Sequence, residues 1–175
     1  MKTLSLEQFN QLIAQAELKP RIKRDLRFMQ STAGMTAGDW AETELLNITD
    51  RTGNKGVLLL EPDTDIYILA YELSRGIANS QTGRAQPIIC DFCRTWQSGS
   101  GAGSISFQRN KQSLNSINFL CCADLACSQH VRNKTVTART SRAQLREDLT
   151  TEQRVARLRN RLGQIISDFH LAPLA

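Results

Sequence analysis

The sequence contains little histidine and no long apolar run. Its only histidines are His130 and His170. Catalytic zinc sites usually combine histidine and carboxylate ligands with an open position, and a Ser–His–Asp triad needs a histidine base, so this scarcity argues against both kinds of enzyme. No stretch approaches the roughly 18 apolar residues of a membrane span. The glycines of GSGAG lack the strand-to-helix context of a nucleotide site. We therefore expect a soluble protein that is not an enzyme and does not bind a membrane.

No export signal is evident at the start of the chain. The opening stretch MKTLSLEQFNQLIAQ places glutamate, glutamine and asparagine where a secretory signal needs an apolar core. We expect a cytoplasmic protein, and a monomer by default. Cytoplasmic thiols are kept reduced, and the five cysteines are an odd number, so a disulfide framework is not favoured. The cysteines therefore indicate metal or thiol chemistry.

Four of the cysteines form two pairs with the spacing of a zinc site. Cys90 and Cys93 form a C-x2-C pair, and Cys122 and Cys127 form a C-x4-C pair further along the chain. A tight turn directs both sulfurs of a pair to one point, and four thiolates at about 2.3 Å complete a tetrahedral zinc site. We predict that these four cysteines hold one structural Zn2+ ion. A redox C-x-x-C of the thioredoxin type would need a βαβ context, whereas a Gly/Ser-rich loop follows here.

The residues between the two pairs predict a treble clef, in which a zinc knuckle and a hairpin precede a helix that carries the last ligand. SISFQRN and SINFLCC predict two strands around a turn at 111–115. Asp124 is expected to cap a helix with Cys127 in its first turn, where the helix dipole favours a thiolate. Cys121 is expected to be a buried spare cysteine. His130 is an alternative ligand, or else a partly exposed residue of the helix surface.

The chain before the knuckle predicts short helices followed by a hairpin. Helices are expected after the capping box SLEQ, over about residues 20–30, and from Asp39 through Leu46. GVLLLEP and IYILAYEL predict an antiparallel hairpin. Asp63 and Asp65 between them are interpreted as turn residues, because an aspartate side chain bonds the backbone that follows it.

The end of the chain predicts an amphipathic helix. Apolar residues of TTEQRVARLRNRLGQII recur at helical spacing, and Thr150 with Gln153 forms a capping box at its start. The predicted fold class is α+β. We predict an N-terminal region of helices and a short antiparallel sheet over residues 1–86, followed by a treble-clef zinc finger with a C-terminal amphipathic helix over residues 87–175.

Several motifs resemble one known family. CDFC, FLCCADLACSQHVRNKT and TTEQRVARLRNRLGQII are similar to the C-terminal treble-clef zinc-finger domain of the elongation-factor-G-binding proteins of the FusB/FusC type, which confer fusidic acid resistance. The resemblance extends from about Pro87 to Phe169. It implies a non-enzymatic protein that contacts elongation factor G on or near the ribosome and could relieve fusidic-acid-type stalling. The metal ligands that it implies are Cys90, Cys93, Cys122 and Cys127. The chain departs from the family pattern at Cys121 and His130.

Positive charge is concentrated towards the C-terminus. Residues 132–161 hold nine basic and three acidic side chains, whereas residues 1–89 hold ten basic and eleven acidic ones. A concentrated positive field attracts acidic surfaces, so we predict an acidic partner, although a solvated helix face would explain any single arginine. The alternative to elongation factor G is a ribosomal or other RNA surface. The predicted partner-binding residues are Arg132, Lys134, Arg154, Arg157 and Arg161.

Overall fold

The computed structural model describes residues 1–78, 81–108, 115–136 and 148–174. Within them, no helix has the length and apolar content that crossing a membrane requires. Most of the turn predicted at 111–115 and three of the nine basic residues, Arg139, Arg142 and Arg146, lie outside this part of the chain. The described helices are α1 (Leu6–Gln15), α2 (Pro20–Asp25), α3 (Phe28–Ser31), α4 (Ala37–Ala41), α5 (Cys127–Val131) and α7 (Thr151–Asp168). The described strands are β1 (Leu45–Thr49), β2 (Lys55–Leu60), β3 (Tyr67–Arg75), β4 (Ile88–Ile89), β5 (Trp96–Gln97), β6 (Ala102–Gln108) and β7 (Ser116–Cys122).

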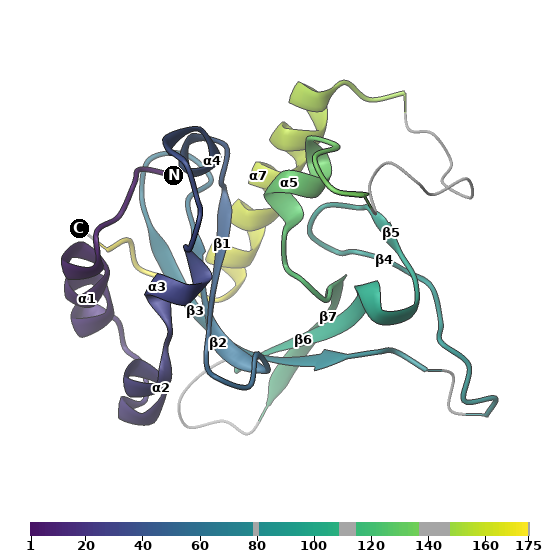
Figure 1. Cartoon of the computed structure of the whole chain (residues 1–175), viewed down its shortest axis with the longest axis horizontal. Helices are drawn as coiled ribbons and strands as arrows, with labels where there is room; N and C mark the ends of the chain where they lie inside the picture. Colours follow the sequence, from purple (N-terminus) through teal and green to yellow (C-terminus); the bar gives the residue numbers. More distant parts are fainter. Residues whose placement is uncertain (79–80, 109–114, 137–147, 175) are drawn as a thin grey trace.

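Five strands form one antiparallel sheet in the order β1-β2-β3-β6-β7 (Figure 1). Both predicted hairpins are present, because β2 pairs with β3 and β6 pairs with β7. The two halves join where β3 pairs with β6, with Leu73 opposite Ile105. The sheet therefore runs across the predicted boundary between residues 86 and 87. The division of the chain into two regions at this boundary stays a prediction. β4 and β5 form a separate small hairpin beside the sheet.

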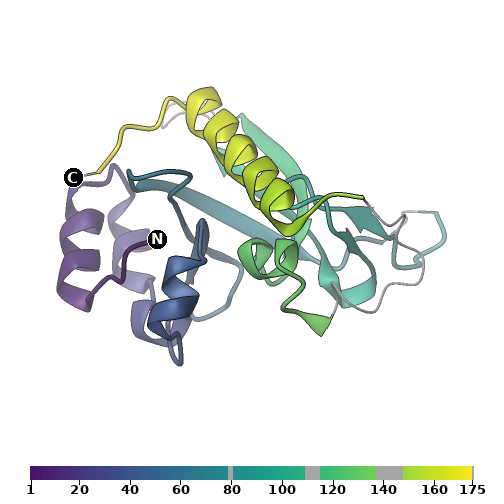
Figure 2. The same ribbon diagram turned by 90° about the horizontal axis from the view of Figure 1, so that it is seen from above.

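The part of the large sheet formed by β1, β2 and β3 is buried on both faces. Successive residues of a strand point to opposite faces, and along β2 Leu58 and Leu60 enter one core while Val57 and Leu59 enter the other. The first core contains α5, α7 and the cysteine region, and the second contains α1, α3 and α4. Figure 2 shows α7 and the N-terminal helices on opposite sides of the strands. Burial on both faces explains why β2 is a continuous apolar run and does not alternate with polar residues.

The second predicted helix is broken into α2 and α3. Met29 is 59% exposed, whereas its neighbour Phe28 is buried. Phe28 stacks on Phe9 of α1 with ring centroids 4.5 Å apart. In the break, the Arg27 N–H donates to the Thr49 carbonyl at 3.0 Å. The prediction of one continuous helix was wrong because this contact with β1 and the burial of Phe28 set the backbone path.

The third predicted helix also ends earlier than expected. α4 is capped by Thr36, with Asp39 as the third residue of the capping box and not as the cap. Leu45 and Leu46, predicted at the helix end, belong to β1, where they enter opposite cores. A helix would place neighbouring residues only about 100° apart around its axis, so it could not bury both on opposite faces. The packing of the sheet therefore overrides the local helical signal.

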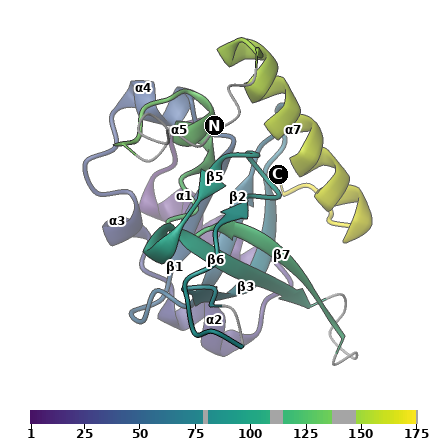
Figure 3. The ribbon, with the colours of Figure 1, turned by 90° about the vertical axis from the view of Figure 1, so that its right-hand side faces the viewer.

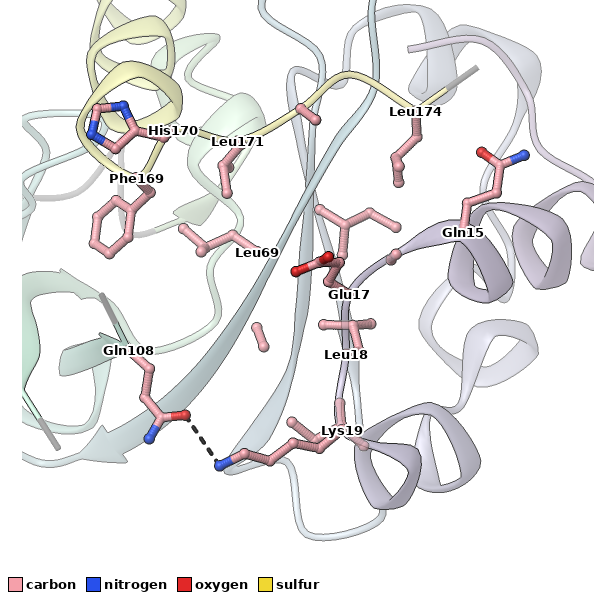
Figure 4. Close-up of a pocket in the computed structure, with 15 residues that line it drawn as sticks. Gln15, Glu17, Leu18, Lys19, Leu69, Gln108, Phe169, His170, Leu171 and Leu174 are labelled. Atoms are coloured by element: carbon pink, nitrogen blue, oxygen red, sulfur yellow. Dashed lines mark hydrogen bonds between the residues drawn. The ribbon is translucent and has the colours of Figure 1, made fainter. Parts of the chain in front are cut away.

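The segment after α7 returns to the N-terminal helices. The Leu174 N–H donates to the Ile66 carbonyl at 2.8 Å, just before β3. A cavity of about 420 Å³ lies between this segment, β3 and the chain that follows α1 (Figure 4). Lys19 Nζ donates to Gln108 Oε1 at 3.2 Å across one side of it. The C-terminal segment thus packs at the same end of the sheet as α1.

Candidate metal centre

Four buried cysteines meet where the β4–β5 hairpin approaches the end of β7 and the start of α5. The knuckle between β4 and β5 contributes the first pair, the last residue of β7 contributes the third cysteine, and the first residue of α5 contributes the fourth. The Arg94 N–H donates to the Cys90 carbonyl at 2.9 Å and closes the knuckle turn. The four cysteines are Cys90, Cys93, Cys122 and Cys127, each at most 3% exposed.

The spacing of the sulfur atoms fits one tetrahedral metal ion. Cys90 Sγ lies 3.8 Å from Cys127 Sγ, and Cys93 Sγ lies 3.5 Å from Cys122 Sγ. All four sulfurs lie within 4.8 Å of one another. Tetrahedral zinc with Zn–S bonds of about 2.3 Å requires sulfurs roughly 3.8 Å apart, whereas a disulfide requires about 2.0 Å. The arrangement is that of one structural zinc ion, and the cysteines are free thiols or thiolates.

Cys121 does not belong to this cluster. It is fully buried in the core between the sheet and α7, as predicted. Burial raises the pKa of the Cys121 thiol, and the nearby Cys90 sulfur adds to the effect. The side chain therefore stays a neutral thiol and packs as a small apolar group.

His130 is buried beside the cluster, so the prediction of a partly exposed surface histidine was wrong. It is 2% exposed, and its Nδ1 lies 3.1 Å from Cys122 Sγ. Its Nε2 forms an ion pair with Asp124 Oδ2 at 3.2 Å. Burial disfavours the charged ring, but Asp124 and the Cys93 sulfur outweigh this effect and raise the pKa of His130 to about 10. His130 therefore links a cluster sulfur to a carboxylate.

Asp124 has a different role from the predicted helix cap. α5 has no side-chain cap, and Asp124 Oδ1 instead accepts from the Ala126 N–H at 3.0 Å in the turn before the helix. Cys122, Asp124 and His130 are close enough to share an ion among themselves. Four thiolates are the softer donor set and match the tetrahedral preference of zinc better than this mixed group does.

Gln97 is a second buried donor to the cluster, and no motif in the sequence marked it. It is 1% exposed, and its Nε2 donates to Cys122 Sγ at 3.3 Å. A Cβ atom at Gly101 would lie 2.9 Å from Gln97 Oε1. One glycine of GSGAG is therefore explained by the room it leaves for this amide, which only the folded loop reveals.

Replacing Gln97 with leucine should weaken zinc retention. Partners that donate to a ligating atom typically change metal affinity by about 10- to 100-fold when removed. We expect a shift of this size in competition with a chelator at fixed pH. Gln108→Leu, which removes the exposed amide that contacts Lys19, is the matched control and should leave zinc retention unchanged. Equal zinc retention in wild type and Gln97→Leu would mean that the N–H···S contact does not support the metal.

Two of the predicted partner-binding residues form ion pairs within the chain. Arg132 Nη2 and Nη1 donate to Glu44 Oε1 and Oε2 at 2.6 and 2.9 Å, in a bidentate pair. Arg159 Nη2 also reaches Glu44 Oε1, at 3.3 Å. Lys134 pairs with Glu42 at the surface. These pairs connect the start of β1 to α5 and α7, so they join regions far apart in the sequence.

The Glu44 carboxylate is almost completely buried. Its side chain is 2% exposed. Burial raises its pKa, but the hydrogen bonds and charge of Arg132 outweigh burial and hold the pKa of Glu44 below its ordinary value. The Glu44 and Leu45 N–H groups donate to Ser128 Oγ of α5 at 2.9 and 3.2 Å. Glu44 was not among the residues predicted from the sequence, because a single glutamate before a strand has no distinguishing local pattern.

The other three predicted partner-binding residues, Arg154, Arg157 and Arg161, lie on α7 against the zinc finger. Arg154 Nη1 donates to Asn133 Oδ1 at 3.0 Å, and Arg157 Nη2 donates to the Cys93 carbonyl at 3.5 Å. The Arg161 guanidinium lies 5.2 Å from the centroid of the Phe119 ring on β7. Figure 3 shows α7 alongside β7. The predicted apolar stripe faces inward, and its fully buried members are Leu158, Leu162 and Ile165.

Comparison with known families accounts for most of the chain. The family model described as the FBP C-terminal treble-clef zinc-finger matches residues 21–169. The match includes both cysteine pairs and the whole of α7. No curated protein and no solved structure matched the chain.

Proposed function

Because the chain belongs to the FBP C-terminal treble-clef zinc-finger family, we propose that it is a non-enzymatic, zinc-stabilised protein that binds elongation factor G and acts on translation in the cytoplasm. The observation that carries this proposal is the family match over both cysteine pairs and α7. Release of a factor stalled by fusidic acid is the step on the ribosome that such binding could affect.

The proposed metal ligands are the four clustered cysteines. Zinc supplies folding energy here and no reaction chemistry, because four thiolates leave no open coordination position. The ion would join the knuckle to the end of β7 and to α5. It would therefore hold together the surface on which α7 lies. The ligands in this proposal are Cys90, Cys93, Cys122 and Cys127.

The proposed contact surface is the arginine row of α7, defined as Arg154, Arg157 and Arg161. Contacts with the finger orient these side chains in advance, so less side-chain entropy is lost on binding an acidic partner. Arg132 and Lys134 form ion pairs with Glu44 and Glu42. We therefore propose that they mainly hold α5 and α7 in place and contribute less than the arginine row to binding of the partner.

Substitution of the arginine row should weaken binding of elongation factor G. In Arg154→Gln/Arg157→Gln/Arg161→Gln, we expect at least a tenfold loss of affinity, about 1.4 kcal/mol, with the difference shrinking at high salt. Calorimetric titration with purified factor measures this. Arg21→Gln/Arg24→Gln/Arg51→Gln removes the same charge from exposed positions away from α7 and should bind normally.

A pull-down with and without nuclease separates this function from the alternative of RNA binding. Elongation factor G that stays bound after nuclease treatment supports direct protein contact. Loss of the factor on nuclease treatment, together with unchanged affinity of the arginine-row variant for the purified factor, would favour an RNA or ribosome surface as the partner.

A further inference from the structure

A small pocket lies between the zinc knuckle and α7. Its volume is about 300 Å³. Arg94 lines it from the knuckle, and Arg157, Asn160, Arg161 and Gln164 line it from α7. Three guanidinium groups and two side-chain amides, from two separate elements, thus border one space. All five groups can donate hydrogen bonds.

Arg94 has a backbone conformation that favours glycine. Its φ is +61°, in the left-handed region, where a Cβ atom is crowded by the backbone. Glycine would adopt this conformation without strain at the end of the knuckle turn. The chain nevertheless places an exposed arginine there, next to Cys93. Strain of this kind is concentrated at functional sites, and it is an observation separate from the pocket itself.

The other groups of the pocket are held in place by their neighbours. Arg157 Nη2 donates to the Cys93 carbonyl at 3.5 Å, and Arg161 Nη1 donates to Gln164 Oε1 at 3.2 Å. Asp91 also lines the pocket, but its Oδ2 accepts from the Leu120 N–H at 2.7 Å. The lining contains one carboxylate and three guanidinium groups, so the pocket has a net positive charge. The contacts of Arg157 and Arg161 orient their side chains before a ligand binds.

We propose that this pocket binds a phosphoryl group. A planar carboxylate accepts from one guanidinium fork in a single plane, so it would engage only one of the two elements that border the pocket. A tetrahedral phosphoryl group presents oxygens in several directions and can accept from the knuckle and from α7 together. The site takes either free phosphate or a phosphate of an RNA backbone. This assignment goes beyond binding of elongation factor G and does not depend on it.

The test is a titration of inorganic phosphate into ¹⁵N-labelled protein at constant ionic strength, followed through the arginine Nε–H signals. Wild type should show saturable shifts. In Arg94→Gly, the phosphate affinity should fall at least tenfold while the melting temperature stays equal or rises, because glycine relieves the backbone strain. Arg161→Gln should also weaken binding. Arg51→Gly, an exposed turn residue distant in sequence from the pocket, is the charge-matched control.

Two further titrations identify the source of the phosphoryl group. If inorganic phosphate binds and Arg94→Gly weakens this binding, the ligand is a free or terminal phosphate. If only a single-stranded RNA oligomer binds, and Arg94→Gly weakens that binding, the ligand is a backbone phosphate. Acetate that binds as well as phosphate would overturn the inference in favour of a carboxylate site. Unchanged affinity in both Arg94→Gly and Arg161→Gln would overturn it altogether. Elongation factor G is absent from these titrations. A negative result would therefore overturn the phosphoryl site without bearing on the proposed binding of elongation factor G.

Discussion

Replacement of Cys127 with serine should abolish zinc binding and remove most of the stability of the treble clef. Cys127 is fully buried at the start of α5, with its sulfur 3.8 Å from that of Cys90. A serine hydroxyl is not a thiolate, and zinc binding free energy is folding free energy in such sites, about 10–16 kcal/mol in isolated fingers. We expect a loss of unfolding free energy on the order of 5 kcal/mol or more. Metal analysis and chemical denaturation measure the two effects.

Cys121→Ala is the control for this experiment. Cys121 is equally buried and next to Cys122, but it lies outside the cluster in the described structure. The variant should keep one zinc per chain and lose no more than about 1–2 kcal/mol, the cost of a small buried cavity. If Cys127→Ser protein also retained one zinc per chain, the assignment of the four ligands would be refuted.

Replacement of Glu44 with glutamine should destabilise the protein by about 3–5 kcal/mol, since it leaves Arg132 largely buried without its counter-ion. The side chains of the pair are only 2% and 12% exposed. The neighbouring pair of Glu42 and Lys134 is about half exposed, at 44% and 45%. Glu42→Gln is therefore the matched control and should cost less than about 1 kcal/mol. Urea denaturation at neutral pH measures the unfolding free energy of both variants. Equal losses in Glu44→Gln and Glu42→Gln would contradict the claim that burial makes the Glu44–Arg132 pair the more important one.

The contribution of Glu44 should also depend on pH. Its pKa is lowered in the folded protein from an ordinary value of 4.5, because Arg132 outweighs the effect of burial. A lowered carboxylate pKa stabilises the fold above the unfolded pKa, and this stability is lost as the pH falls through the folded pKa. The difference in stability between wild type and Glu44→Gln should therefore be constant at neutral pH and narrow below about pH 4.5. A difference that stays constant into that range would exclude the ionised carboxylate as its source.

The parts that sequence reasoning predicted correctly depend on short-range patterns. The C-x2-C and C-x4-C pairs lie at turns, where neighbouring residues are close whatever the rest of the chain does. The capping boxes at Ser5 and Thr150 form between residues three apart. The strands of both hairpins adjoin one another in sequence, so their periodicity and turn residues predict their pairing.

The wrong or missing parts all depend on contacts between distant segments. Leu45 and Leu46 form a strand because the sheet presents a core on each face. His130 is buried because α5 packs over the cluster, and Gln97 reaches Cys122 from another hairpin. Glu44 and Arg132 are 88 residues apart in the sequence. No local pattern encodes such pairs, because their partners become neighbours only after the chain has folded.

The sequence by itself determined that this protein has two thiol pairs suited to zinc, two hairpins and an amphipathic basic helix. Each of these features depends on the spacing of residues that are close together in the sequence. Only the tertiary structure decided that one sheet unites both halves and that Arg132 faces inward to Glu44. It also decided that Arg94 meets the arginines of α7 at one pocket. The reason is that burial and charge pairing depend on which surfaces meet in three dimensions, and the free energy of those contacts outweighs local preference.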